Sequence, residues 1–297
     1  MRGTDGATRG RRRARGGRGG PAPVAPDRIP RELLEAVIRD TDGEAGAAVL
    51  DSVDEAIGLL LGYALLTVSG EQTFAMHRLV GRLARTNASS VTRTGAITCA
   101  VGALQATFPK ASSEYEQWPA CERLLSHALD ATTYAQRDDV ALAETAALLV
   151  RAGLYQRERA QYDSACELVQ RAVAIYEAQS GPPGPELANA LDVLGITLWR
   201  LARLSAARDV LQRALVISQS VHGPEHREFA RTLCNLGLVQ EHLGEFEAAR
   251  STHQRALAMM EAASGPEHSD VARTLSNLGS LHQPREIQRL VFVGAPG

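Results

Sequence analysis

The chain has 297 residues, of which 44% are hydrophobic and only 4% aromatic, and its formal net charge is -2. This charge gives no general reason to expect binding to nucleic acids or anionic membranes, while the scarcity of aromatic residues favours helices packed through aliphatic side chains. No run of about 18 apolar residues is present to span a membrane, and the N-terminus lacks the apolar core of a secretory signal, so we expect a cytoplasmic protein. The four cysteines are widely spaced without a C-x-x-C pair, which predicts reduced, mostly buried thiols.

Residues 1–23 form a Gly/Arg-rich tail that contains too few apolar side chains to offset the cost of ordering its backbone. We expect disorder there. Such a tail can bind RNA through its arginines, but the absence of interleaved aromatic residues makes a simple flexible segment the preferred interpretation.

Residues 24–88 change pattern. A helix is expected to open at Ile29-Pro30, and a second to run through 54–60. Two apolar, partly β-branched runs at 64–68 and 73–76 flank a short turn at 69–71, which predicts a β-hairpin. A further helix follows from His77 to Leu83. Two helices, a hairpin and a final helix indicate a small winged-helix domain.

Residues 89–143 are expected to be a helical connector. One apolar stripe includes Ile97, Val101 and Leu104, and a second helix opens at Trp118-Pro119, where proline suits the first turn.

Residues 144–283 contain an internal repeat with a period of 42. Gly153, Gly195, Gly237 and Gly279 are spaced by this interval, and so are three Arg-Ala pairs and three linker glycines. In one unit an apolar stripe from Leu233 to Leu243 predicts the first helix, and residues 246–257 predict the facing one. Gly-Pro linkers end the units because glycine can adopt a left-handed cap and proline prevents helix continuation. Three full helical hairpins and the first helix of a fourth are predicted, with Gly237 and Ala249 allowing close backbone approach.

The pattern Leu236-Gly237, Gly244, Phe246, Ala249, Ala256-Leu257 resembles the tetratricopeptide repeat, and the 42-residue period with its Gly-Pro-Glu-His linker is similar to the long repeats of kinesin light chains and bacterial relatives. The resemblance implies an all-α solenoid that binds a peptide or protein in the concave groove formed by the first helix of each unit. Asparagines at the positions of Asn235 and Asn277 bond an extended ligand backbone in the kinesin-like repeats; simple solvation is the equally weighted alternative. The groove positions are Asn189, Asp192, Trp199, Arg200, Arg231, Asn235, His242, Arg273 and Asn277.

The segment before the repeats resembles the winged-helix end of bacterial NB-ARC signal-transduction ATPases, on the basis of residues 25–30, the hairpin and Met76-His77-Arg78. In that family the histidine of a Met-His-Asp motif lies near the β-phosphate of bound ADP. His77 matches this position, but Arg78 replaces the aspartate.

Lys110 is the only lysine in the chain, and it is not preceded by the glycines or followed by the hydroxyl residue that a phosphate-binding P-loop requires. Nucleotide hydrolysis by this chain alone is therefore not expected, and no cofactor is predicted. His77 would contact a nucleotide only if a nucleotide-binding domain were supplied elsewhere; otherwise it is a structural residue at a helix start.

His222 and His226 are four residues apart, but the intervening Gly223-Pro224 places them in a turn between repeats instead of on one helix face, so no metal site is predicted. No local motif of a hydrolase, metalloprotease or dinucleotide-binding enzyme is present, and we expect no enzymatic activity.

The leading hypothesis is a non-catalytic protein- or peptide-binding scaffold, the sensor part of an NB-ARC/tetratricopeptide signalling protein without its nucleotide-binding domain. One alternative is the sensor half of a functional ATPase completed by a missing upstream segment. Another is a winged-helix DNA-binding regulator, which would use Arg78, Arg82 and Arg85. The tail 284–297, which begins at Pro284, either caps the last helix or is unrelated to the repeats.

Overall fold

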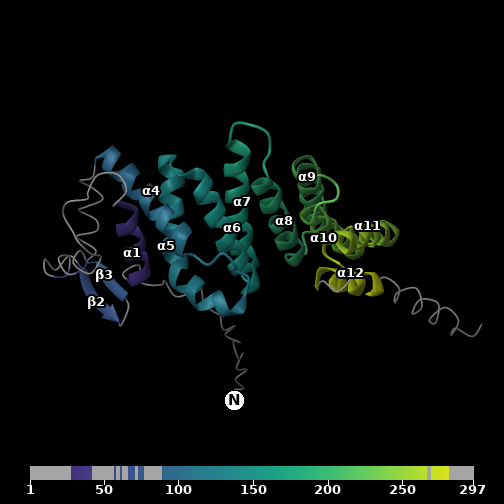
Figure 1. Ribbon diagram of the computed structural model, residues 1–297, viewed down its shortest axis with the longest axis horizontal. Coiled ribbons are helices and arrows are strands. Elements are labelled where there is room, and N and C mark those ends of the chain that lie inside the picture. Colours follow the sequence, from purple (N-terminus) through teal and green to yellow (C-terminus); the bar gives the residue numbers. More distant parts are fainter. Residues whose placement is uncertain are drawn as a thin grey trace, which may run out of the picture.

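The computed structural model describes residues 28–41, 57, 61, 66–70, 73–76, 89–265 and 269–280. This part is mostly helical, as predicted. Its helices follow one another in a single row along the molecule (Figure 1). Three consecutive antiparallel pairs are α6 (Leu142–Glu158) with α7 (Tyr162–Ala178), α8 (Pro185–Arg200) with α9 (Leu204–His222), and α10 (Arg227–His242) with α11 (Phe246–Ser264), and the row ends with α12 (Ser269–Ser280).

Each pair is a hairpin whose tight turn repeats with the same 42-residue period. The second residue after the first helix has a left-handed backbone, with φ of 59° at Ala160, 57° at Ala202 and 80° at Gly244. The linkers between hairpins also need positive φ, at Gly223 (φ 85°, ψ 165°) and Gly265 (φ 80°, ψ 161°). The ψ values differ from the left-handed cap predicted from the sequence, because the chain extends directly into the linker instead of coiling once more. This conformation is essentially restricted to glycine.

The repeated glycines bring the two helices of each hairpin together. A Cβ atom built on Gly153 would lie 2.5 Å from Cγ2 of Val169, and one on Gly195 would lie 2.5 Å from Cγ of Leu211. Gly237 meets the imidazole ring of His253 in the same way. The predicted role of Gly237 in close packing is confirmed, although the three atoms nearest to a Cβ built there all belong to His253.

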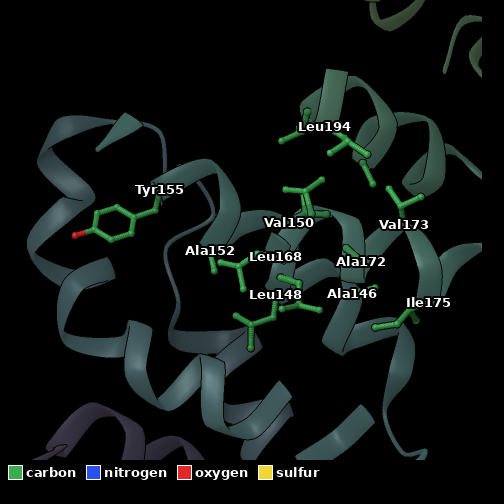
Figure 2. Packing of buried hydrophobic residues seen from close by; sticks show 14 of the residues in the cluster. Ala146, Leu148, Val150, Ala152, Tyr155, Leu168, Ala172, Val173, Ile175 and Leu194 are labelled. Atoms are coloured by element: carbon green, nitrogen blue, oxygen red, sulfur yellow. The ribbon is translucent and has the colours of Figure 1, made fainter. Parts of the chain in front are cut away.

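One hydrophobic core runs through successive hairpins. Figure 2 shows part of it, where Leu148 and Ala152 of α6 lie close to Leu168 of α7. The core continues from Leu33 of α1 to Val239 of α10, and a smaller cluster joins α10, α11 and α12 around Phe229 and Met260. The second helix predicted over 246–257 is present as α11, in which Ala249 and Ala256 are buried whereas Phe246 is 44% exposed and Ala248 is exposed.

The predicted β-hairpin is present. Strand β2 (Leu66–Gly70) pairs antiparallel with β3 (Thr73–Met76), with a register shift between Val68 and Gly70. A third strand was missed: Ile29 and Pro30 form β1 (Ile29–Pro30), which pairs with Phe74 and Thr73 and gives the sheet order β1-β3-β2. The helix expected to open at Ile29 begins instead at Arg31, as α1 (Arg31–Thr41).

The structure describes only single residues from the rest of the predicted winged-helix domain. Ile57 is helical and packs in a small core with Leu66 and Phe74. The other positions of the helix predicted at 54–60, and the whole helix predicted from His77 to Leu83, lie outside the described residues. The tails 1–23 and 284–297 lie outside them as well.

The segment predicted as a connector contains α4 (Ser90–Thr107), a single 3-10 turn η1 (Tyr115–Gln117) and α5 (Trp118–Asp138). The predicted stripe residues Ile97, Val101 and Leu104 are buried, and so are Cys121 and Leu124 of α5. Helix α4 packs against both α5 and α6, and α5 packs against α6, which is the order in which each repeat hairpin packs on the next. The helical row therefore continues on the N-terminal side of the 42-residue repeats.

The cysteine prediction is confirmed within the described residues. No disulfide joins any of the four cysteines, and Cys121, Cys166 and Cys234 are buried, while Cys99 is half-buried. Burial raises the pKa of the Cys121 thiol to about 11, so this thiol is not a reactive nucleophile at neutral pH.

Candidate binding face

The first helices of successive repeats lie next to each other, since α8 packs against α10 and α10 against α12. We call the surface that they share the first-helix face. All nine predicted groove residues belong to these helices: Asn189, Asp192, Trp199 and Arg200 to α8; Arg231, Asn235 and His242 to α10; and Arg273 and Asn277 to α12.

A polar cluster joins α8 to α10. The side-chain amide of Asn235 donates to both carboxylate oxygens of Asp192, at 2.9 and 3.1 Å. The Nη2 atom of Arg231 lies 3.5 Å from the Asp192 carboxylate. The same atom donates a hydrogen bond to Oδ1 of Asn189 at 3.2 Å, and it lies 2.7 Å from a carboxylate oxygen of Glu228. Four of the predicted residues are thus brought together, and Glu228 joins them.

Asp192 is the buried centre of this cluster, with 3% of its surface exposed. A buried carboxylate needs compensating donors, which Asn235 and Arg231 supply. Asp192 therefore positions these two side chains and offers almost no surface of its own to a ligand. The amide nitrogen of Asn235 is already engaged, which leaves its side-chain oxygen as the atom that it can offer to a backbone N–H.

An aromatic cluster lies at the other end of the same two helices. The rings of Trp199 and His242 meet edge to face with centroids 5.2 Å apart, and the guanidinium of Arg200 lies 4.7 Å from the centre of the Trp199 ring. His242 is held by a 2.9 Å hydrogen bond between its Nδ1 and the carbonyl of Leu238. Arg200 and His242 are exposed, so this cluster can contact a partner directly.

Helices α10 and α12 are joined by contacts at the equivalent positions, but through different side chains. The amide of Asn277 donates to the sulfur of Cys234 at 3.5 Å, the same 43-residue relationship that links Asn235 to Asp192. The thiol of Cys234 also lies 3.4 Å from the hydroxyl of Thr274. Arg273 is exposed. The row of polar residues therefore extends onto α12.

The histidine pair in the linker packs as a stack. The rings of His222 and His226 are 4.3 Å apart and nearly parallel, and Nδ1 of His226 caps α10 by accepting from the backbone N–H of Glu228. Within the described ranges, no three His, Cys, Asp or Glu side chains form a group that could hold a metal ion. None of the described helices is long and apolar enough to cross a membrane. His77, the predicted nucleotide contact, lies outside the described residues.

Glu228 and Ser218 are the residues near this face that the sequence analysis missed. Glu228 completes the coordination of Arg231, and Ser218 lines a cleft beside it. A comparison of side-chain size at equivalent repeat positions is the signal that could have found Ser218, because it stands where the neighbouring repeats have Tyr176 and Met260.

Comparisons with known proteins agree with this fold. The family model described as tetratricopeptide repeat matches residues 144–220, 206–262 and 228–286. No curated protein sequence matches the chain.

Several solved structures resemble it at low sequence identity. The crystal structure of BtubC (BKLC) from P. vanneervenii is 17% identical and covers 73% of this chain and 88% of its own, with a TM-score of 0.52. The apo form of RapI is 12% identical, with a TM-score of 0.50, and the match covers 72% of this chain and 55% of RapI. A kinesin-light-chain type structure from Podospora anserina, with nearly identical TPR-like repeats, is 14% identical, covers 62% of this chain and 94% of its own, and has a TM-score of 0.38.

At these identities the likeness to solved structures concerns the fold alone. The repeat period, the hairpin packing and the family match all refer to the same stretch of sequence. Residues 144–286 of this chain are therefore tetratricopeptide repeats.

Proposed function

We propose that the chain is a non-catalytic binding module that holds a segment of a protein or peptide along the first-helix face. The observation that carries this proposal is the row of exposed polar and cationic side chains on three successive first helices: Asn189, Arg200, His242 and Arg273. Packing of a solenoid requires apolar residues where helices touch, but it does not require the guanidinium of Arg200 over the Trp199 ring or the ring of His242 against it. Arginine and tryptophan are enriched where protein surfaces bind partners.

The internal order of the face also supports binding. Asn235 and Arg231 are fixed by their contacts with Asp192, so they lose little side-chain entropy when a ligand binds. An extended peptide backbone that runs across α8 and α10 could donate an N–H to the side-chain oxygen of Asn235. The polar and aromatic clusters would then supply side-chain contacts on either side of this anchor.

The finer proposal is that this module is the sensor part of a cytoplasmic NB-ARC/tetratricopeptide signalling protein. It is supported by a β-hairpin and the helix α1 on the N-terminal side of the helical row, in the order expected for such a protein. A nucleotide contact by His77 would require a separate nucleotide-binding domain. Nucleic acid is not the proposed ligand.

Selection from a displayed library of random peptides against the immobilised full-length chain tests the proposal. We expect enriched peptides to lose at least tenfold in affinity for the double variant Arg200→Ala with His242→Ala. These two side chains are exposed, so their removal should leave the fold intact. The matched control is Gln212→Ala with Gln254→Ala, which removes two exposed side chains 42 residues apart on the second helices.

Equal affinity of the enriched peptides for the wild type and the Arg200/His242 variant would overturn the first-helix face as the binding site. A library that yields no enriched peptide would contradict peptide binding as such. A mobility-shift titration with duplex DNA across a salt series separates the remaining alternative, because DNA binding that weakens steeply with salt would favour the regulator hypothesis.

A further inference from the structure

A cleft of about 330 Å³ opens between the second and third hairpins, next to the polar cluster. It lies where the start of α8, the end of α9 and the start of α10 meet. Asn189 and Arg231 belong both to the cleft and to the first-helix face, so the two are continuous. The lining residues used below are Glu186, Asn189, Ser218, Glu228, Arg231 and Thr232.

The cleft coincides with a small side chain at a repeat position that is otherwise large. Ser218 occupies the register of Tyr176 one repeat earlier and of Met260 one repeat later. Met260 is 1% exposed and reaches the first helix of the next unit, where its sulfur lies 3.3 Å from the hydroxyl of Thr274. The residue equivalent to Thr274 is Thr232, which lines the cleft. The serine therefore leaves open the space that a large side chain fills in the next repeat.

Two of the residues that line the cleft carry a polar group without a partner among the described residues. The hydroxyl of Ser218 is unpaired although the residue is only 2% exposed, and the Nε of Arg231 is buried and unpaired while its Nη2 contacts Asp192 and Glu228. Buried donors without partners are costly and rare in folded proteins. Both groups can donate a hydrogen bond, so an occupant of the cleft must present an acceptor oxygen.

The charge around the cleft disfavours an anionic occupant, and the unpaired donors disfavour an ammonium or guanidinium group, because these cations offer no hydrogen-bond acceptor. Glu186, Glu228 and the adjacent Asp192 carry three negative charges against the one positive charge of Arg231. An occupant that carries a carboxylate or a phosphate would be repelled by these three residues. A phenol suits the cleft because it is neutral, accepts from the unpaired N–H and O–H groups, and can donate to a glutamate.

The preceding repeat shows a phenol in the equivalent place. Tyr176 lies between α6 and α8, and burial together with the neighbouring Glu186 raises its pKa to about 12. The register equivalent of Glu186 is Glu228, which lines the cleft. A tyrosine beside the first-turn glutamate of the next first helix is thus a packing arrangement that this fold already contains.

We propose that the cleft at Ser218 receives the side chain of a tyrosine in the bound peptide. The phenol would take the place that Tyr176 and Met260 occupy from within the chain at the neighbouring junctions. Its oxygen accepts from Arg231 and Ser218, and its hydroxyl donates to Glu228. This inference rests on the proposed peptide binding along the first-helix face and adds a specificity pocket to it.

The test compares peptides selected from one random displayed library on three full-length proteins: the wild type, Ser218→Met and Ser220→Met. Methionine at 218 fills the cleft with a side chain that the fold accepts at 260, so the variant should remain folded. Ser220 lies on the same helix and is exposed, which makes Ser220→Met the matched control. Melting curves of all three proteins verify that the folds are equivalent.

We expect tyrosine at one fixed position in peptides selected on the wild type and on Ser220→Met, and loss of that preference on Ser218→Met. Peptides enriched on all three proteins without a tyrosine preference would overturn the pocket while leaving peptide binding intact. Failure to enrich any peptide on the wild type would overturn the proposed function itself.

A substitution in the selected peptide provides a second, independent measurement. Changing its tyrosine to phenylalanine keeps the ring and removes only the hydroxyl, so affinity for the wild type should fall about tenfold. The same change should cost less against Ser218→Ala, in which one partner of the hydroxyl is missing. An equal loss against both proteins would place the tyrosine outside the cleft.

Discussion

The amide of Asn235 binds both carboxylate oxygens of Asp192, a residue 43 positions earlier in the chain, and so ties α10 to α8 across the boundary between two repeats. The carboxylate is almost completely buried, and the only other side chain that compensates it within the described residues is Arg231. This relationship makes Asn235 a structural residue as well as a candidate ligand contact.

We therefore predict that Asn235→Ala lowers the free energy of unfolding by about 1–3 kcal/mol, because it removes a donor from a buried carboxylate. Asn235→Asp should be more damaging, since it places a second carboxylate against Asp192. Asn189→Ala is the control: it removes one exposed acceptor and should change stability by less than about 0.5 kcal/mol. Urea denaturation of the four proteins measures these differences, and equal stability of Asn235→Ala and wild type would contradict the structural role.

His253 predicts a dependence of stability on pH. The residue is fully buried against Gly237, neither ring nitrogen has a partner in the described part of the chain, and burial lowers its pKa from 6.5 to about 4. The unfolded chain therefore binds a proton that the folded chain does not bind between these two values. Stability is fully present above about pH 6.5 and declines as the pH falls towards 4, by an amount of roughly 3 kcal/mol for this group.

The variant His253→Leu isolates this effect, because Leu211 occupies the equivalent position against Gly195. We expect the variant to be more stable than wild type at pH 8, by about 1–3 kcal/mol, since two unpaired ring nitrogens are removed from the core. Its advantage should grow as the pH is lowered from 6.5 to 4. Urea denaturation of both proteins at each pH measures this advantage, and a difference that stays constant over this range would show that His253 is hydrated or paired in solution.

Much of the architecture could be predicted from the sequence because its signals are local. Each hairpin needs an apolar stripe with helical spacing, a turn and a linker glycine, and all of these repeat at an interval of 42. Strand β1 could not be predicted in this way, since its two residues, Ile29 and Pro30, are held by pairing with Phe74 and Thr73, more than 40 positions away. The same reason explains why the coupling of Asn235 to Asp192 was missed. Both residues were assigned to the groove, but only three-dimensional packing shows that one satisfies the other.

The repeated glycine on the first helices predicts that the same substitution to alanine changes stability differently at Gly195 and at Gly279. Gly195→Ala places a Cβ 2.5 Å from Cγ of Leu211, which is not the free end of that side chain, so helix α9 must shift. We expect a loss of about 1–3 kcal/mol in the free energy of unfolding. Gly279 occupies the same repeat position on α12, but no described residue lies within 4 Å of a Cβ built there. Gly279→Ala should be neutral or stabilise by up to about 1 kcal/mol through helix propensity.

Thermal denaturation of the two glycine variants compares the same chemical change with and without a close neighbour among the described residues. The double variant Gly195→Ala with Leu211→Ala should recover part of the loss, because the smaller side chain at 211 makes room for the new methyl group. Equal destabilisation by Gly195→Ala and Gly279→Ala would contradict close packing as the cause.

The turns inside the hairpins offer a final test, because the same left-handed backbone is occupied by alanine at 202 and by glycine at 244. A non-glycine residue is strained in this conformation by roughly 1–2 kcal/mol, whereas glycine loses about 0.5–1 kcal/mol more on folding because its unfolded chain is more flexible. Strain is the larger of the two, so we expect Ala202→Gly to raise the free energy of unfolding by up to about 1 kcal/mol and Gly244→Ala to lower it by a similar amount. Urea denaturation of both single variants measures whether the free energy of unfolding rises or falls in each. The double variant, which exchanges the residues between the two turns, should have a free energy of unfolding close to that of the wild type. Opposite signs from these would mean that the cost of ordering glycine, and not backbone strain, governs these turns.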